Sequence, residues 1–243
     1  MLKEKMKSKM KEREFILEGK KVIDILQADY IDRKTIYEFI KKLGVKTYGT
    51  ILDFGCGEKP YEILFNSDKY IGVDIKESGH DDSDKHEDYY YDGKQLPFQD
   101  NTFDFIISTQ VFEHVQYLDI VIKELYRVLK PNGKIIITVP MAEEEHEIPY
   151  DFRRFTQYGI IEFMVQNGFD IISSGKLNNF KYSMKILKIA QKSAKQRYSP
   201  SVFNKLNMWI YVIFANLSRL LFNDNIVTDN EIFSNKVWIE CKK

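Results

Sequence analysis

Several features that would place a protein in a special class are scarce or missing in this chain. Its 243 residues include only two cysteines, Cys56 and Cys241, which excludes a disulfide framework and is typical of a reducing compartment. No run of 18 or more apolar residues occurs, so the sequence predicts no membrane-spanning helix. Basic and acidic residues number 36 each, and this balance leaves no global field that would attract nucleic acid or membrane. The basic start of the chain lacks a following apolar stretch, so we expect no secretory signal and a cytoplasmic protein.

Short apolar runs alternate with helical patterns over residues 50–140. Four runs are rich in β-branched or aromatic residues and only four to seven residues long, as buried parallel strands are: ILDF, YIGVDI, FDFIIST and KIIITVP. Between the last two, apolar residues at helical spacing from Leu118 to Leu129 predict a helix that the Pro131-Asn132-Gly133 sequence ends. The alternation predicts an α/β fold, with a doubly wound parallel sheet that has helices on both faces.

The remaining segments complete this division of the chain. Residues 10–43 have a helical period, and we expect residues 1–45 to form a helical segment that packs on the core. Residues 46–243 are expected to form the main domain, in which a helix begins at a capping Thr156 and ends at Gly168. The runs FDIISSG and SNKVWIECKK follow as strands, and residues 177–230 between them read as a basic helical insertion.

The sequence ILDFGCGEKPY, residues 51–61, predicts a ligand site at a turn between a strand and a helix. Glycines without a Cβ let the backbone approach a ligand closely, although some turns need glycine for their conformation alone. Asp74 ends the next strand 21 residues after Asp53, where nucleotide-binding folds place an acid for the ribose hydroxyls. Glu58 would repel a pyrophosphate, whereas Asp53 suits a cationic ammonium group. A ligand with a ribose and an amino-acid end but no phosphate is S-adenosylmethionine.

The segment from about Thr50 to Pro140 resembles the class I S-adenosylmethionine-dependent methyltransferases. Five motifs of that family appear in order: LDFGCGEKPY, YIGVDI, YYYDGKQLPFQDNTFDFII, STQVFEHV and LYRVLKPNGKIIITVP. The chain departs from the first motif because Lys59 replaces its third glycine. The resemblance implies a Rossmann-like, seven-stranded, mostly parallel sheet whose antiparallel last strand is SNKVWIECKK.

The same resemblance assigns parts of the cofactor to positions in this chain. It implies that the glycine turn lines the methionine part, that Asp74 holds the ribose, and that residues 92–93 flank the adenine. The residues expected to bind the cofactor are Asp53, Gly55, Cys56, Gly57, Asp74, Ile75, Asp92, Gly93, Gln110 and Phe112.

A hydroxyl acceptor needs a general base, for which histidine is the first choice. His114 and His146 follow the fourth and fifth strands, at the sheet edge where ligands bind in such folds, and are the catalytic candidates. Either could instead serve only in packing or capping. His80 and His86 lie in an acidic segment without recognisable ligand spacing, so we predict no metal site.

The sequence PYDFRRF after the fifth strand is the candidate substrate loop. Its residue types grip polar rings and anionic groups, and it resembles a segment of methyltransferases that act on small molecules, including sugar-modifying ones. An ordinary charged surface loop is the alternative. The expected substrate-binding residues are Tyr150, Asp151, Arg153 and Arg154.

Residues 171–222 contain nine lysines and arginines and no acidic residue. Five lysines at spacings of four and three share one face of a predicted helix: Lys181, Lys185, Lys188, Lys192 and Lys195. Residues 181–222 could lie on an anionic membrane surface, or form a lid or homodimer surface, which we favour slightly because most apolar helical faces are buried in protein. Nucleic acid is not expected as a partner, because aromatic and basic residues are not interleaved as in a stacking platform.

These observations together predict a methyltransferase that transfers a methyl group from S-adenosylmethionine to a small molecule, by O-methylation of a sugar or glycan precursor. A carbon- or oxygen-methylating enzyme of the quinone or lipid type is the alternative within the same class. Outside that class, a NAD-linked oxidoreductase and a non-catalytic cofactor-binding scaffold stay open.

Overall fold

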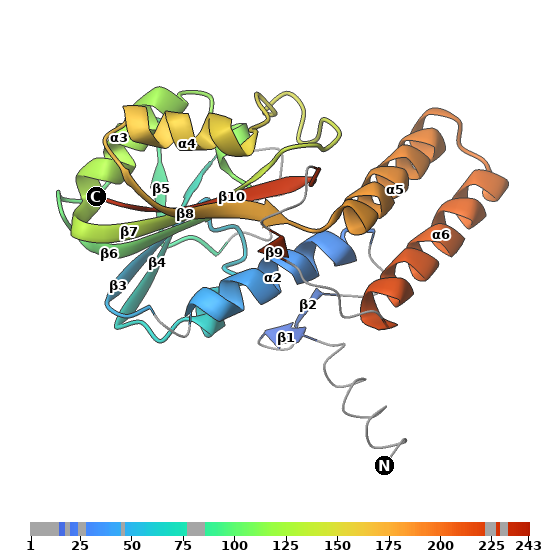
Figure 1. Ribbon diagram of the computed structural model, residues 1–243, viewed down its shortest axis with the longest axis horizontal. Helices are drawn as coiled ribbons and strands as arrows, with labels where there is room; N and C mark the ends of the chain where they lie inside the picture. The colour runs from blue at the N-terminus through green and yellow to red at the C-terminus, as the bar shows by residue number, and fades with distance from the viewer. Residues whose placement is uncertain are drawn as a thin grey trace, which may run out of the picture.

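A mixed β-sheet between two layers of helices organises the molecule (Figure 1). The computed structural model describes residues 15–17, 20–23, 28–44, 47–76, 86–221, 227–228 and 233–243. Within these residues the main sheet has eight strands in the order β5-β4-β3-β6-β7-β10-β8-β9. Its strands are β3 (Thr50–Phe54), β4 (Lys69–Ile75), β5 (Tyr89–Tyr91), β6 (Phe103–Thr109), β7 (Leu129–Pro140), β8 (Asp170–Leu177), β9 (Val227–Thr228) and β10 (Lys236–Lys242).

The direction of the strands confirms the predicted α/β class. Strands β5, β4, β3, β6 and β7 are parallel, and β10 pairs antiparallel with both β7 and β8. The sequence SNKVWIECKK therefore forms the antiparallel last strand, as expected. The two-residue strand β9 pairs with β8 at the edge and was not predicted.

Both faces of the sheet are buried, which explains the continuous apolar runs of its central strands. In β3, the side chains of Ile51, Leu52 and Phe54 are all 0% exposed. One face packs against α3 (Leu118–Val128) and α4 (Gln157–Gln166), and the other against α2 (Tyr30–Gly44), as Figure 1 shows. Helix α4 begins as predicted, since the Thr156 hydroxyl accepts a hydrogen bond from the Gly159 N–H at 3.1 Å.

Three expectations about helices are wrong. Residues 15–17 and 20–23 form a small antiparallel sheet, β1 (Phe15–Leu17) and β2 (Lys20–Ile23), and are not part of the helix expected over residues 10–43, whose second half is α2. Residues 1–14 of the expected helical segment lie outside the described residues. Gly19, between these strands in the sequence, disfavours a helix. Helix α3 ends at Val128, and Pro131–Gly133 belongs to β7 instead of ending the helix.

The third correction concerns the glycine turn. The segment after Pro60 forms only the short 3₁₀ helix η1 (Glu62–Leu64) and not the long helix expected there. The turn-forming sequence Asn66-Ser67-Asp68 follows immediately before β4, so too few residues remain for an α-helix. This turn therefore offers no row of N–H groups from the first turn of an α-helix.

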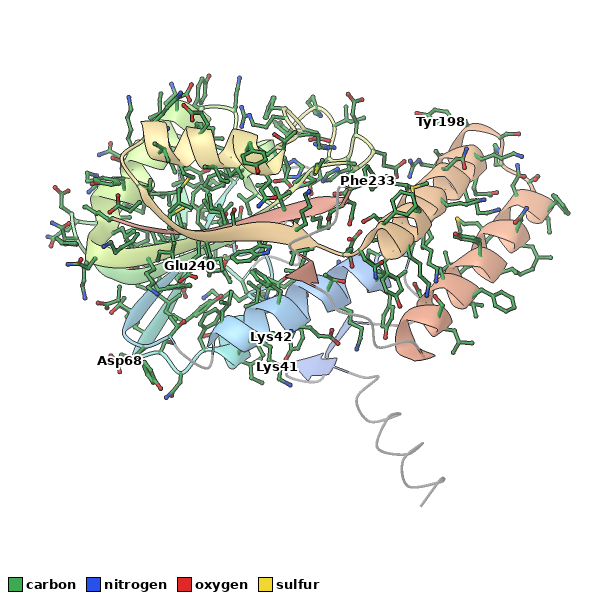
Figure 2. All side chains as sticks on the ribbon, in the orientation of Figure 1. Lys41, Lys42, Asp68, Tyr198, Phe233 and Glu240 are labelled. Atoms are coloured by element: carbon green, nitrogen blue, oxygen red, sulfur yellow. The ribbon has the colours of Figure 1, made fainter. Side chains whose placement is uncertain are left out.

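The basic insertion contains two helices, α5 (Phe180–Tyr198) and α6 (Val202–Leu221), which form a hairpin that extends beyond the sheet (Figure 1). The hairpin has its own apolar cluster, in which Tyr182, Ile186 and Val212 pack on the start of α2. Tyr198 lies near the tip of the hairpin and is 88% exposed (Figure 2). No helix in the described ranges combines the length and the apolar character needed to cross a bilayer.

Candidate active site

A cleft of about 680 Å³ lies where the parallel strands end, beside the start of α2. Its walls come from the segments after β3, β4, β5, β6 and β7, because the carboxyl ends of parallel strands meet at one edge of the sheet. Eight of the residues predicted to bind cofactor line this cleft: Gly55, Cys56, Gly57, Asp74, Ile75, Asp92, Gly93 and Gln110.

The glycine turn after β3 forms the floor of one end of the cleft. Gly55 has φ +73°, and a Cβ there would lie 2.4 Å from the Val111 side chain, so only glycine fits. A Cβ on Gly57 would meet no protein atom within 4 Å, which leaves the space beside this residue open to a ligand. Lys59 adopts φ +51°, the left-handed conformation that the missing third glycine would take, and its ammonium pairs with Asp88.

Asp74 ends β4 at this turn. One oxygen of its carboxylate accepts a hydrogen bond from the Gly57 N–H at 2.9 Å, and the other accepts from the Ile75 N–H at 2.7 Å. These bonds hold the carboxylate at the edge of the cleft. Asp92 is fixed similarly, since the N–H groups of Gln95 and Lys94 donate to it and lower its pKa.

Two predicted cofactor residues do not reach the cleft. Asp53 is 2% exposed and accepts a hydrogen bond from the Tyr70 hydroxyl at 2.6 Å, and burial raises the pKa of Asp53 to about 7. Phe112 is 0% exposed and packs edge-on against Phe54. Both side chains are buried beside the strand ends that border the cleft. The sequence alone does not show whether a residue at such a position packs in the core or contacts a ligand.

The predicted substrate loop is only partly a substrate surface. Tyr150 lines the cleft, as does the unpredicted Phe152. Asp151, however, is tied to the Arg154 guanidinium by two hydrogen bonds of 2.5 and 2.7 Å. Arg153 donates to the backbone carbonyls of Phe112, Val115 and Gln116. The three charged residues therefore hold the loop against the rest of the protein and do not line the cleft, and their contact with substrate stays a prediction.

A buried lysine holds Gln110, one of the residues that line the cleft. Lys236, at the start of β10, is 2% exposed and donates to Gln110 Oε1 at 2.8 Å and to Glu143 Oε2 at 2.9 Å. Gln110 has φ +57° and also donates to the Thr138 hydroxyl. Because Lys236 lies in a strand that reads as core, nothing in its sequence context indicated this role.

The two candidate catalytic histidines meet in the cleft. Their rings are edge to face with centroids 4.8 Å apart. His114 Nδ1 lies 2.8 Å from the Tyr150 carbonyl oxygen, and His146 Nδ1 lies 3.0 Å from that of Glu144. Because a carbonyl only accepts, each Nδ1 carries the hydrogen in the neutral ring and each Nε2 is left as a free acceptor. Burial lowers the pKa of His114, which favours this neutral form.

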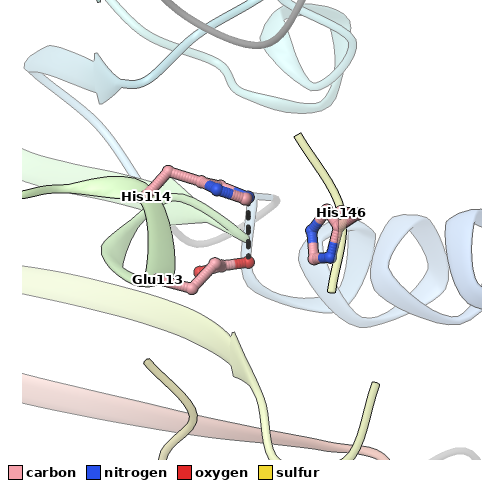
Figure 3. A group of neighbouring side chains, drawn as sticks. All are labelled: Glu113, His114 and His146. Atoms are coloured by element: carbon pink, nitrogen blue, oxygen red, sulfur yellow. Dashed lines mark ion pairs between the residues drawn. The ribbon is translucent and has the colours of Figure 1, made fainter. Parts of the chain in front are cut away.

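Glu113 is the functional candidate that the sequence did not single out. It is 0% exposed, and neither of its carboxylate oxygens has a hydrogen-bond partner among the described residues. Figure 3 shows its carboxylate directed toward the His114 ring, with 3.8 Å between Glu113 Oε1 and His114 Nε2. Burial raises the pKa of Glu113 to about 8. Its only signal in the sequence is its position beside His114.

Of the other two histidines, only His86 lies among the described residues. His86 is exposed, and its backbone N–H donates to the Gly57 carbonyl oxygen. His80 lies outside the described residues.

Comparison with known proteins agrees with this geometry. A family model described as a methyltransferase domain matches residues 52–137. The uncharacterized protein MJ0638 of Methanocaldococcus jannaschii is 31% identical over 199 residues, covering 81% of this chain and 83% of that protein. A demethylmenaquinone methyltransferase of Lactobacillus johnsonii is 33% identical over 113 residues, 40% of this chain and 46% of the relative.

Solved structures show the same fold at low sequence identity. The [4+2]-cyclase SpnF superposes with a TM-score of 0.57 at 15% identity, over 100% of this chain and 93% of that one. A methyltransferase of Thermotoga maritima, described as a possible histamine N-methyltransferase, gives a TM-score of 0.54 at 16% identity, over 90% and 98% of the two chains.

The chain belongs to the class I S-adenosylmethionine-dependent methyltransferases. It is an enzyme whose cofactor is S-adenosylmethionine, which sets aside the NAD-linked oxidoreductase and the non-catalytic scaffold. The glycine turn and the fixed Asp74 carboxylate fit this cofactor, because they offer open space and a hydrogen-bond acceptor at one end of the cleft.

Proposed function

We propose that this methyltransferase methylates a hydroxyl oxygen of a small molecule, and that the acceptor is a sugar or glycan precursor. The observation that carries the proposal is the pair of imidazoles, His114 and His146, whose Nε2 atoms are free acceptors in the cleft. A hydroxyl is a weak nucleophile until its proton is removed or its oxygen is polarised, whereas an amine in its neutral form is already nucleophilic.

The cofactor end of the cleft would be held by residues of the strand tips. Asp74 would accept hydrogen bonds from the ribose hydroxyls, and Gly55 and Gly57 would let the methionine part lie against the backbone. Asp92 and Gly93 would lie beside the adenine. The cofactor supplies a methyl group on a sulfonium, from which an oxygen can displace a neutral thioether.

The acceptor end lies between the histidines and the aromatic residues Tyr150 and Phe152. There an acceptor hydroxyl would lie beside His114 and His146, and the free Nε2 of one of them would take its proton. The cofactor would supply the methyl group and leave as a neutral thioether. The cleft would hold the two reactants close together and in line, which favours the transfer.

An assay with two groups of acceptors tests the proposal. Nucleotide sugars and lipid-linked sugars form one group, and primary amines of similar size form the other, with methylated product measured by mass spectrometry. We expect product only from hydroxyl compounds. Methylation of amines alone would overturn the assignment to oxygen, and methylation of hydroxyl compounds that contain no sugar would overturn the sugar assignment.

A quinone- or lipid-type acceptor is the second candidate, and the outer face of α6 favours it. Six large apolar side chains recur along this face at spacings of three and four and are between 36% and 74% exposed: Phe203, Leu206, Ile210, Ile213, Phe214 and Leu217. We call these six residues the α6 stripe. A contiguous exposed apolar face of this kind is typical of a protein or membrane contact.

The charge of the hairpin favours an anionic membrane over a second copy of the chain. Lys192 Nζ donates to Asn207 at 2.7 Å and lies over the Tyr211 ring, so this lysine of α5 lies beside the α6 stripe. Neither helix contains an acidic residue, so two hairpins face to face would bring like charges together, whereas anionic lipids would attract them. Arg197 of α5 pairs with Glu144, next to the acceptor end.

The expected lid is not supported, because none of the described side chains of α5 and α6 lines the cleft. Sedimentation with vesicles of phosphatidylcholine and phosphatidylglycerol tests the membrane contact. We expect binding that salt weakens and that the double variant Ile210→Ser, Phe214→Ser abolishes, whereas Ile63→Ser, which changes an equally exposed residue elsewhere, binds normally. Unchanged vesicle binding in the double variant would exclude the membrane contact. A dimer in buffer that the double variant dissociates would establish the homodimer instead.

A further inference from the structure

We propose that Glu113, His114 and His146 bind a divalent transition-metal ion at the acceptor end of the cleft. The inference rests on the proposed function for its role in the reaction, but the binding of the ion stands on its own geometry. No metal site was predicted from the sequence, because the residues come from two separated segments, the 3₁₀ helix η3 (Phe112–His114) and the loop after β7.

The three side chains already lie at nearly the right separation. One potential ligand atom from each lies within 4.8 Å of the others, and His114 Nε2 lies 3.8 Å from Glu113 Oε1. Ligand atoms about 2.0–2.2 Å from a common ion lie roughly 3–3.5 Å from each other, so shifts of about 1 Å would complete the site. Figure 3 shows Glu113 and His114 side by side, with His146 facing them from the neighbouring loop.

Both imidazoles are oriented as metal-binding histidines usually are. Such a histidine donates its second N–H to a carbonyl or carboxylate, which fixes the ring and leaves the other nitrogen for the metal. His114 and His146 each do this with a backbone carbonyl, at 2.8 and 3.0 Å. Asp151 Oδ2 lies 3.4 Å from His146 Nδ1 and adds a carboxylate to that support.

The carboxylate of Glu113 provides a separate indication of a cation. It is fully buried, and neither oxygen has a hydrogen-bond partner among the described residues, although a buried polar group without a partner is costly. The nearby Lys236 ammonium does not fill this role, because it is bound to Gln110 and Glu143. A metal ion beside the histidines would give Glu113 the cation it lacks.

The ligand set points to the kind of ion and to what it would do. Two imidazoles and one carboxylate suit Mn²⁺, Fe²⁺, Co²⁺ or Zn²⁺, whereas Mg²⁺ and Ca²⁺ prefer oxygen ligands alone. Three protein ligands leave coordination positions open to an acceptor, and two neighbouring hydroxyls could fill two of them. A cation lowers the pKa of a hydroxyl that contacts it, so the proton can pass to water before the oxygen attacks the methyl carbon. The acceptor class is therefore a vicinal diol.

Calorimetric titration of MnCl₂ and ZnCl₂ into chelator-treated, full-length protein tests the site. We expect one ion per chain, and a loss of affinity in Glu113→Gln and His146→Gln beyond the 10- to 100-fold typical of supporting partners. His146 lies in a partly exposed loop, so its variant should fold even where Glu113→Gln does not. His86→Ala, which removes an exposed histidine outside the cluster, is the matched control and should bind the ion normally.

The same samples separate this proposal from the proposed function. S-adenosylhomocysteine should bind all four proteins equally, and a chelator should abolish hydroxyl methylation while Mn²⁺ restores it. Absence of ion binding in folded protein that binds S-adenosylhomocysteine, or equal binding by the cluster variants, would overturn the metal site. Methylation that resists the chelator would overturn its catalytic role and leave the histidines as direct bases.

Discussion

The two ends of the cleft are built in different ways. At the cofactor end, short contiguous segments at the strand tips present backbone and the carboxylates of Asp74 and Asp92, each held by backbone N–H groups of residues close to it in the turns. At the acceptor end, the site depends on side chains from separate segments, as in the contacts between Arg153 and the carbonyls of Phe112, Val115 and Gln116. Substitutions outside its turns should therefore leave the geometry of the cofactor end intact. The geometry of the acceptor end depends on contacts between the loop after β7 and the segment that begins with η3.

The largest expected effect is a loss of methylation rate when the acceptor end loses a histidine. His114→Gln keeps a polar side chain but removes the imidazole Nε2 that faces the acceptor, so we expect the rate of methylation to fall about 100- to 10,000-fold. Binding of S-adenosylhomocysteine should stay unchanged, because His114 belongs to the other end. Single-turnover assays with saturating cofactor measure the rate, and a loss smaller than tenfold would exclude His114 from the chemistry.

Breaking the support of the acceptor loop should affect stability. Arg154→Ala leaves Asp151, whose side chain is 3% exposed, without its ionic partner, and frees the carbonyls of Glu143 and Glu144. We expect the free energy of unfolding to fall by about 2–3 kcal/mol, measured by urea denaturation. Arg197→Ala, in an exposed ion pair, should change it by less than about 1 kcal/mol.

The stability that the Asp151–Arg154 ion pair contributes depends on pH. Burial alone would raise the pKa of Asp151, but the Arg154 guanidinium outweighs burial and lowers that pKa to about 2. The stability that the pair contributes is therefore present above the unfolded pKa of about 4 and is lost as the pH falls toward 2.

If Arg154→Ala is as stable as the wild type at pH 7 but methylates its acceptor poorly, Arg154 binds substrate after all.

A substitution at the cofactor end should have a more moderate effect. Asp74→Ala removes the acceptor proposed for the ribose hydroxyls, and we expect S-adenosylhomocysteine to bind more weakly by about 1–3 kcal/mol. Calorimetry measures this loss. Asp68→Ala, at an exposed aspartate before β4, serves as the control and should bind normally.

The last prediction concerns the pH dependence of stability at Asp53, beneath the cofactor end. Its pKa of about 7 lies above the unfolded value of about 4, so the unfolded chain ionises first and the free energy of unfolding falls as the pH rises between these values. Asp53→Asn removes this decline, so its stability relative to the wild type should rise with pH across that range. Urea denaturation from pH 5 to 8 measures the trend, and parallel curves for the two proteins would show that Asp53 does not titrate there.

The contrast between the two ends also explains what the sequence could reveal. The strand pattern, the glycine turn and Asp74 were predictable because each depends on residues close together in the chain. The roles of Arg153 and Arg154 were not, since a guanidinium that binds carbonyls of its own chain looks the same in sequence as one that binds a substrate. Glu113 was missed because its lack of a partner is visible only in three dimensions.

Near the N-terminus, hydrophobic periodicity predicted the wrong secondary structure for part of the chain. Residues 10–43 carry apolar side chains at helical spacing, yet β1 and β2 occupy part of that range. Lys236 was also missed, because its ionic partners come from other elements of the fold.

The central claim is that the cleft has a cofactor end at Asp74 and a separate acceptor end at the histidines. Calorimetric titration of S-adenosylhomocysteine into Asp74→Ala and His114→Gln, side by side with the wild type, tests it most directly. We predict weaker binding in Asp74→Ala by about 1–3 kcal/mol and unchanged binding in His114→Gln. Equal losses in both variants, or a loss only in His114→Gln, would contradict the account.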